Sequence, residues 1–406
     1  MSGSEFRRGW PPLTAALLGN AIGVHSLPPY TIGLFMGPLQ AEFGWARTSI
    51  SAGITVLTIC SAISAPFVGS ALTRVGAGPL VIGGLGFGSL GYFALSSMGP
   101  SVAIFWAIMA AMALLGSGCG PVTLSHLLVT SFERRRGTAL GVAMMGIGLS
   151  GAVAPFLLGH VVNESGWRMG YVTLGVMMAG AIPVMLFFLV VTKTRFPATA
   201  PRRHLLRESI PWTDPIFLRM LAAFFCVALA SGGVVVHFVP MLVDNGYAAT
   251  RASAGASFLG ISLVAGRLLT GIIIDRVFAP TVAAVIMLGS SLGFVVLFSL
   301  GADWIPLTAV LVGLTLGAEL DLIAYLVSRY FAPAAYGRIV GVLYAGFLVG
   351  VALSPLVYAI LRDAGGSYSP CLLWAAAFLG IGASLFKGLP PFDRPIQSEV
   401  QKLRLA

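Results

Sequence analysis

Two stretches of the chain repeat each other across half its length. Residues 43–74 read FGWARTSISAGITVLTICSAISAPFVGSALTR, and residues 245–276 read NGYAATRASAGASFLGISLVAGRLLTGIIIDR. A shift of 202 residues, without a gap, aligns Gly44 with Gly246, the Ser-Ala-Gly triplet 51–53 with 253–255, Gly69 with Gly271 and Arg74 with Arg276. An internal repeat of this length indicates a chain built from two related halves.

A second pair of stretches supports the same division. A shift of 200 residues aligns Gly137, Gly141, Gly146 and Pro155 with Gly337, Gly341, Gly346 and Pro355. Apolar letters match easily by chance in such a composition, whereas glycine, proline and arginine rarely align together. Parallel halves with a pathway between them are typical of alternating-access transporters.

The composition excludes a soluble fold. Of the 406 residues, 57% are hydrophobic and only 9% are charged, and the mean hydropathy is +0.93. A soluble domain has about 25% charged residues, so a soluble multidomain enzyme and a disordered chain are both excluded. No segment alternates as a membrane β-strand does, and the chain is therefore predicted to be a polytopic helical membrane protein.

A membrane-spanning helix needs about 20 apolar residues, and twelve such segments are predicted. They cover residues 13–38, 48–69, 79–98, 102–130, 138–160, 169–192, 215–240, 252–273, 281–300, 305–330, 338–361 and 370–388. The first follows Arg7 and Arg8 without a cleavage site, so it is interpreted as a span and not as a signal peptide. We expect an all-α fold of twelve transmembrane helices in two pseudo-symmetric bundles, 1–192 and 215–388, with a linker at 193–214 and a tail at 389–406.

The basic residues predict the orientation. With the N-terminus inside, 19 Lys and Arg residues lie in or beside one set of loops and 4 in the other. Basic residues favour the cytoplasmic side, so both termini are predicted to be cytoplasmic in a multi-pass plasma membrane protein, with a bacterial inner membrane favoured. The net charge of +10 then reflects topology, and no nucleic-acid partner is expected.

Enzyme and metal motifs give no signal. The four cysteines lie in apolar runs without CxxC spacing, and the one GxSxG match, at 289–293, lies inside a predicted span. We therefore expect no catalytic activity, no metal and no cofactor.

The loop at the end of the first repeat resembles a known signature. Residues 69–76, GSALTRVG, resemble the G-x-x-x-D-R-x-G motif of the major facilitator superfamily, and residues 271–276, GIIIDR, resemble its C-terminal copy. In that family the motif latches the inward gate through charge pairs, which implies gating roles for Gly69, Arg74, Gly271, Asp275 and Arg276. Thr73 stands where aspartate is usual and Phe278 where the last glycine is usual, so the N-terminal latch does not carry over.

Two patches are similar to the monocarboxylate-transporter and oxalate–formate-exchanger branch of that superfamily. They are residues 132–146, FERRRGTALGVAMMG, and residues 267–271, RLLTG. The resemblance implies that Arg267, in the eighth span, binds a substrate carboxylate. The animal members of the branch usually have an aspartate one turn before this arginine, and that position is Leu263 here. A lysine in the first span also takes part in the branch, and its nearest match here is Pro29. Proton coupling by those residues therefore does not carry over.

Three charged residues lie deep inside predicted spans, where an ionisable side chain is a candidate site residue. They are Arg267, Glu319 and Asp321. Arg267 is interpreted either as a fork for a carboxylate or as a structural ion pair with Asp321, which lies at a similar depth. Asp321 is either a proton carrier or that permanent partner. Glu319 is a further proton-coupling candidate, with helix packing or a gate contact as the alternative.

Uncharged polar residues extend the list of candidates. Asn20 and Tyr30 in the first span and His237 in the seventh are candidate substrate ligands, and His25 is a candidate proton carrier. For the histidines, and for His126, the alternative is a satisfied interior side chain. Pro28 and Pro29 are expected to break the first span, and the resemblance implies that spans 1, 4, 7 and 10 line the cavity.

Three functions remain open. The first is a secondary active transporter that moves a small organic anion, a monocarboxylate or related carboxylate, by alternating access with proton coupling. The second is a proton-driven exporter of drug-like or cationic compounds, whose usual fifth-span glycine–proline motif is missing from residues 146–155. The third is a membrane-embedded enzyme or sensor. For the first we expect carboxylate substrate, protons and the lipid bilayer as partners, and a monomer.

Overall fold

The computed structural model describes residues 3–195, 210–244 and 249–392. Most of the predicted linker 193–214 and tail 389–406, and the start of the second repeat at 245–248, lie outside these ranges. The described residues form helices and no strands, so the predicted all-α class is confirmed.

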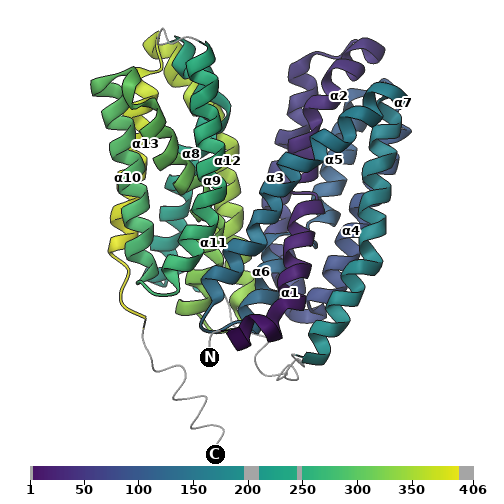
Figure 1. Cartoon of the computed structure of the whole chain (residues 1–406), viewed down its shortest axis with the longest axis horizontal. Coiled ribbons are helices and arrows are strands. Elements are labelled where there is room, and N and C mark those ends of the chain that lie inside the picture. Colours follow the sequence, from purple (N-terminus) through teal and green to yellow (C-terminus); the bar gives the residue numbers. More distant parts are fainter. Residues whose placement is uncertain (1–2, 196–209, 245–248, 393–406) are drawn as a thin grey trace, which may run out of the picture.

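The helices fall into two bundles, which Figure 1 shows side by side. One contains α1 (Gly3–Ile22), α2 (Leu27–Phe43), α3 (Arg47–Val75), α4 (Ala77–Ser96), α5 (Val102–Gly116), α6 (Pro121–Ser131) and α7 (Arg136–Arg195). The other contains α8 (Pro215–Asp244), α9 (Ala249–Ile274), α10 (Ala279–Leu300), the short 3₁₀ helix η2 (Ala302–Trp304), α11 (Ile305–Tyr330), α12 (Tyr336–Gly365) and α13 (Ser369–Lys387). We call them the N-terminal and C-terminal bundles.

The first predicted span is broken where its prolines predict. The helix stops at Ile22 and restarts at Leu27, which places Pro28 and Pro29 in the first turn of α2. Proline is tolerated there because the first N–H groups of a helix have no intrahelical acceptor. The Ser26 hydroxyl donates to the Asn20 carbonyl at 2.6 Å and so satisfies a carbonyl that the break leaves free.

The fourth predicted span also breaks, which the sequence analysis did not predict. Instead of one helix over 102–130, α5 ends at Gly116 and α6 begins at Pro121. The intervening Ser-Gly-Cys-Gly stretch passes close to α4, where no room for a Cβ remains between Gly84 and the Cys119 backbone. Hydropathy does not detect this break, because glycine and cysteine keep the window apolar.

The fifth and sixth predicted spans form the two arms of α7, which turns at Gly166. The φ angle of this glycine is 82°, a conformation that residues with a Cβ rarely adopt. Among the described residues, nine helices are long and apolar enough to cross a membrane, with α7 counted once over 57 residues and a shorter apolar helix at Phe258–Ile274. The chain is thus a multi-pass helical protein, although its helices do not map one to one onto the twelve predicted spans.

The most extensive contacts between the bundles are two helix crossings, and both involve glycines that the repeats align. Helix α3 packs on α12, and α7 packs on α9. At the first crossing no room for a Cβ remains between Gly69 and the Gly337 backbone, and at the second the same is true of Gly137 and Gly271. The aligned glycines therefore mark the places where the halves touch.

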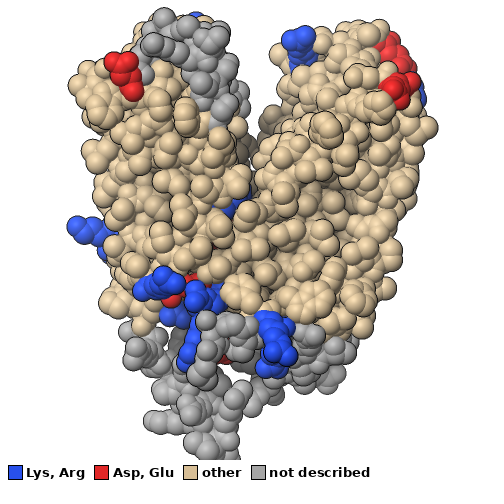
Figure 2. Space-filling view, viewed as in Figure 1, with Lys and Arg blue, Asp and Glu red and all other residues tan. Residues whose placement is uncertain are grey.

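The bundles separate at the opposite end. Figure 2 shows a deep cleft between them, open at the end away from the start of α1 and closed toward it. With the predicted orientation, this is an outward-facing arrangement.

Candidate functional site

Arg267 lies in α9 at the crossing between the bundles. Its side chain is only 5% exposed, and its own backbone carbonyl leaves no room for a Cβ at Gly141 of α7. The guanidinium Nε and Nη1 have no hydrogen-bond partner among the described residues. Leaving buried donors of a charged group without hydrogen bonds is costly, so these two nitrogens make Arg267 the leading candidate site residue in the described part of the chain.

Asp321 lies on the side of α11 that faces α9. The glycines one and two turns before it, Gly317 and Gly313, pack directly on the α9 backbone at Leu263 and Leu259, and helical spacing puts Asp321 on the same stripe. The carboxylate is fully buried, and neither oxygen has a partner among the described residues. No ion pair within 4.0 Å joins it to Arg267 in the described residues, so this conformation does not contain the structural pair that was one alternative.

Glu319 points to a different neighbour. The Ser231 hydroxyl of α8 donates to its Oε1 at 2.5 Å, and the side chain is 3% exposed. Glu319 thus joins α11 to α8 inside the C-terminal bundle, which agrees with the helix-packing alternative. Arg267 still acts on both carboxylates electrostatically.

His25 lies in the break between α1 and α2, opposite the break between α5 and α6. Its Nε2 is 3.5 Å from the Ser117 hydroxyl, and Nδ1 has no partner among the described residues. The ring centroid is 6.2 Å from that of Tyr344 on α12, which brings the N-terminal bundle into contact with the C-terminal one. Tyr344 lies within electrostatic range of Arg267. Its ring stacks on that of Phe347, with the ring planes 13° apart.

Sequence reasoning missed Tyr344. A charge marks a candidate residue inside a predicted span, and an uncharged tyrosine lacks that mark. However, it follows Gly341 by three residues, and Gly341 packs on the Ala65 backbone of α3. Helical spacing from that contact glycine was the available signal that Tyr344 faces the other bundle.

The three predicted substrate ligands are dispersed. Asn20 donates from Nδ2 to the Ala143 carbonyl of α7 at 3.2 Å, and the Tyr30 ring, 41% exposed, lies against Gly151. His237 has Nδ1 3.0 Å from the Tyr368 hydroxyl and Nε2 3.2 Å from the Pro355 carbonyl. Among the described residues, none of the three hydrogen-bonds to Arg267.

His126, whose alternative was a satisfied interior side chain, lies in α6 beside another residue of the far bundle. Its ring centroid is 5.7 Å from that of Tyr336 at the start of α12. The Tyr336 hydroxyl crosses between the bundles and donates to the Ser125 hydroxyl at 3.0 Å.

The closed end of the cleft is fastened by Asp275, a predicted gating residue. Its carboxylate accepts hydrogen bonds from the Gly137 N–H at 2.7 Å, the Thr138 N–H at 2.9 Å and the Thr138 hydroxyl at 2.6 Å. These groups begin α7, where free N–H groups and the helix dipole favour an anion. The C-terminal bundle therefore caps a helix of the N-terminal bundle.

The corresponding position of the first repeat does not do this. Thr73 turns back on its own helix and donates to the Ser70 carbonyl at 2.8 Å. Arg74 and Arg276 are exposed and form no ion pair with another described residue, so their gating roles remain predictions.

Arg136 adds a second fastening that the sequence analysis counted only toward topology. Its Nε donates to the carbonyls of Val129 and Phe132, at 3.1 and 2.8 Å. Its Nη1 reaches across to the Ser328 backbone and hydroxyl oxygens of α11, each at 3.4 Å.

Known proteins of similar sequence include named transporters. The mouse protein named Monocarboxylate transporter 11 is 26% identical over 94% of this chain and 87% of its own length. A Bacillus subtilis protein named Uncharacterized MFS-type transporter YcxA is 24% identical over 92% of each chain.

Solved structures share the fold at low identity. The human organic anion transporter MFSD10 has a TM-score of 0.72 at 14% identity, over 93% of this chain and 99% of its own. The transporter FucP in its outward conformation has a TM-score of 0.69 at 13% identity, over 92% and 97%. The model of the family described as "Major Facilitator Superfamily" matches residues 18–318, and the chain belongs to that superfamily of membrane transporters.

Proposed function

We propose that this protein is a secondary active transporter of small organic anions, a monocarboxylate or a related carboxylate. The observation that carries the proposal is the Arg267 guanidinium, which is 5% exposed, unpaired at Nε and Nη1 and located where the two bundles meet. A carboxylate satisfies such a group with two parallel charge-assisted hydrogen bonds.

Two further facts support a carboxylate. Tyr344 and His25 approach the same region from opposite bundles, so a ligand at Arg267 can be contacted from both. The names of the mammalian relatives, monocarboxylate transporters 11 and 13, point to the same class at 26% identity.

Proton coupling is the second part of the proposal, with Asp321 as the carrier. Its two oxygens are unpartnered among the described residues, and it shares the field of Arg267. A bound substrate carboxylate competes with Asp321 for that positive charge, so substrate binding and Asp321 protonation favour each other. Glu319, whose Oε1 is already hydrogen-bonded, and His25 are secondary candidates.

A proton-driven exporter of drug-like or cationic compounds is the second candidate. The two buried carboxylates, Asp321 and Glu319, favour it because they offer negative charge to a cation. It ranks below the anion transporter because Arg267, next to them, would repel a cation.

We also propose the membrane arrangement predicted from the sequence. The bundles 1–192 and 215–388 move relative to each other around the site, and both termini face the cytoplasm of a bacterial inner membrane. Reporter fusions after Lys387 and in the Arg47 loop test the orientation, since only the first is expected to be active in the cytoplasm.

Counterflow in proteoliposomes tests the transport proposal. Labelled monocarboxylates, aromatic acids and dicarboxylates are compared with cationic dyes. We expect saturable anion uptake that Arg267→Ala abolishes and Arg267→Lys only weakens, while the exposed control Arg134→Gln keeps it. Thermal unfolding checks that each variant is folded. Dye transport that Arg267→Ala leaves intact would overturn the anion assignment.

Coupling is measured separately. An inward proton gradient is imposed on the same vesicles, and Asp321→Asn is compared with wild type. We expect the gradient to drive accumulation in wild type, and Asp321→Asn to retain counterflow but lose accumulation. If the gradient fails to drive wild-type accumulation, proton symport is wrong.

A further inference from the structure

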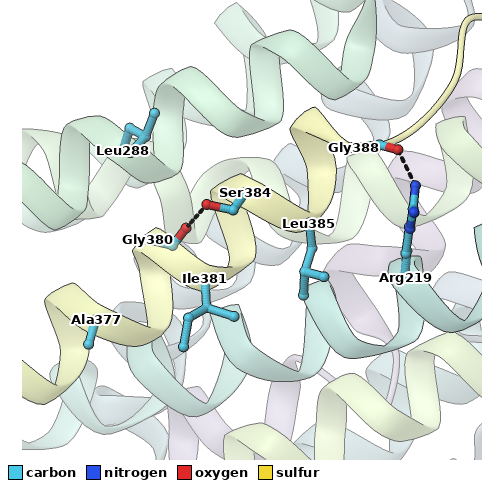
Figure 3. Close-up of a pocket in the computed structure, with 8 residues that line it drawn as sticks. All are labelled: Arg219, Leu288, Ala377, Gly380, Ile381, Ser384, Leu385 and Gly388. Atoms are coloured by element: carbon cyan, nitrogen blue, oxygen red, sulfur yellow. Dashed lines mark hydrogen bonds between the residues drawn. The ribbon is translucent and has the colours of Figure 1, made fainter.

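A surface groove on the C-terminal bundle shares no lining residue with the Arg267 site. It has a volume of about 690 Å³ and is lined by residues of α8, α10 and α13: Arg219, Leu288, Ala377, Gly380, Ile381, Ser384, Leu385 and Gly388. Figure 3 shows it running along α13, from Leu288 and Ala377 at one end to Arg219 and Gly388 at the other.

The body of the groove is apolar and exposed. Leu288 is 45% and Ile381 48% exposed, and these side chains flank the shallow track left by Ala377, Gly380 and Ser384. The track from Ala377 to Gly388 extends about 16 Å at 1.5 Å per residue. This length matches one leaflet, half of a hydrocarbon core about 30 Å thick.

The end of the groove is cationic. Arg219 is exposed and anchored by donating from Nη1 to the Gly388 carbonyl, which leaves further guanidinium donors for another acceptor. Lys387 is also exposed and follows Ser384 by three residues, so it lies on the same face of α13. No ion pair joins either residue to an acidic residue of the described chain. By the predicted orientation, this end faces the cytoplasmic headgroups.

We propose that this groove binds one anionic phospholipid of the cytoplasmic leaflet. One acyl chain lies along the track between Ala377 and Gly388, and the phosphate is held at its end by Arg219 and Lys387. The charge at one end and the apolar length behind it match this ligand and no soluble anion. The cytoplasmic leaflet supplies the lipid, since it is the negatively charged one.

The test uses the full-length protein in detergent and does not depend on transport. Native mass spectrometry compares retention of dioleoyl phosphatidylglycerol with that of dioleoyl phosphatidylcholine. Each basic residue near an anionic surface contributes about a fivefold preference, so two residues predict about 10- to 30-fold in favour of phosphatidylglycerol.

Three variants separate the parts of the site. Arg219→Gln/Lys387→Gln is expected to lose the headgroup preference, and Ser384→Leu, which fills the track but keeps both charges, is expected to lose retention of both lipids. The matched control Arg134→Gln/Arg135→Gln removes two charges from the same end of the other bundle and is expected to keep the preference. If the double variant does not fold, Lys387→Gln alone is expected to reduce the preference about fivefold.

An unchanged preference in the folded double variant would overturn the proposal. Loss of the preference on deleting residues 393–406 would then assign the headgroup contact to the basic residues of that segment.

Discussion

The two crossings between the bundles have the same backbone and different chemistry. At each, a glycine of one aligned pair packs on a glycine of the other pair, Gly137 on Gly271 and Gly69 on Gly337. Only the α7–α9 crossing adds a carboxylate cap, from Asp275, because Thr73 holds the equivalent place at α3–α12. The glycines allow the helices to pack closely at both crossings, and Asp275 adds hydrogen bonds at the α7–α9 crossing alone among the two.

The same asymmetry continues about two helical turns deeper, eight residues before Asp275. The shift of 202 residues aligns Arg267 with Ala65, and the shift of 200 aligns Tyr344 with Met144. At these two positions the C-terminal bundle carries a polar side chain of the proposed site, while the N-terminal bundle has a small or apolar residue. The repeat thus preserves the helix contacts and departs from symmetry at Arg267 and Tyr344.

The largest expected effect comes from replacing the glycines that both crossings share. Gly137→Leu and Gly337→Leu each place side-chain atoms against backbone that cannot yield, and overpacking of this kind costs about 1–3 kcal/mol or more. We expect each to prevent inner closure and to reduce counterflow by more than tenfold. The spin-label distance between positions 47 and 362, at the outer ends of the two bundles, should shorten in both. A large effect at only one crossing would show that closure does not need both.

Removing the carboxylate of Asp275, which has no counterpart at the α3–α12 crossing, should have a smaller effect. Asp275→Asn loses the charge at the α7 N-terminus and presents an amide donor to N–H groups, which costs about 1–2 kcal/mol. We expect the outward-facing population to fall about tenfold relative to the inward-facing one, read from the same spin-label pair. Arg134→Gln, which removes an exposed charge from the N-terminal bundle, serves as the control, and an equal shift there would indicate a general charge effect.

Adding a carboxylate to the α3–α12 crossing tests whether that crossing can be made to resemble the α7–α9 crossing. Thr73→Asp places a carboxylate near the start of α12, and a single anion at an exposed helix N-terminus contributes about 0.3–1 kcal/mol. We expect a modest gain in outward-facing population and slower turnover. Thr73→Asn is the uncharged control, and identical behaviour of the two variants would argue against a dipole effect.

The smallest expected effect concerns the outer end of the N-terminal bundle. The Glu42 carboxylate accepts from the Trp167 indole at 2.6 Å and the Arg168 guanidinium at 2.9 Å, and these hydrogen bonds lower the pKa of Glu42 below its usual 4.5. A lowered pKa adds stability above pH 4.5 that is lost as the pH falls through the folded-state pKa. Glu42→Gln should therefore lower the thermal midpoint slightly at pH 7 and not at pH 3. An equal loss at both values would assign the effect to packing.

The sequence predicted the features that repeat or break a helix. The α1–α2 break follows from Pro28 and Pro29, because proline has a fixed backbone consequence. The aligned glycines indicated the repeat, and the structure adds that they are the contact points between the bundles. The gating prediction for Asp275 came from resemblance, and the structure supplies a helix N-terminus as its partner.

Other features depend on tertiary placement that local patterns do not contain. Equal depth suggested a pair between Arg267 and Asp321, but depth does not specify how two helices are rotated, and the described residues form no such ion pair. Tyr344 carries no charge to mark it, and Arg136 was counted as a loop charge although its side chain bridges to α11.

Two spans of the N-terminal bundle are each interrupted by a break in the helix, at residues 23–26 and 117–120. They touch each other, since a Cβ at Gly120 would collide with the His25 ring. Backbone without helical hydrogen bonds bends at lower cost than a continuous helix, so the paired breaks form an internal joint. We expect the outer segments of these two spans to tilt at this joint while the inner segments stay fixed to the fastened end, so that closing over a solute would be a separate step from opening the inner end.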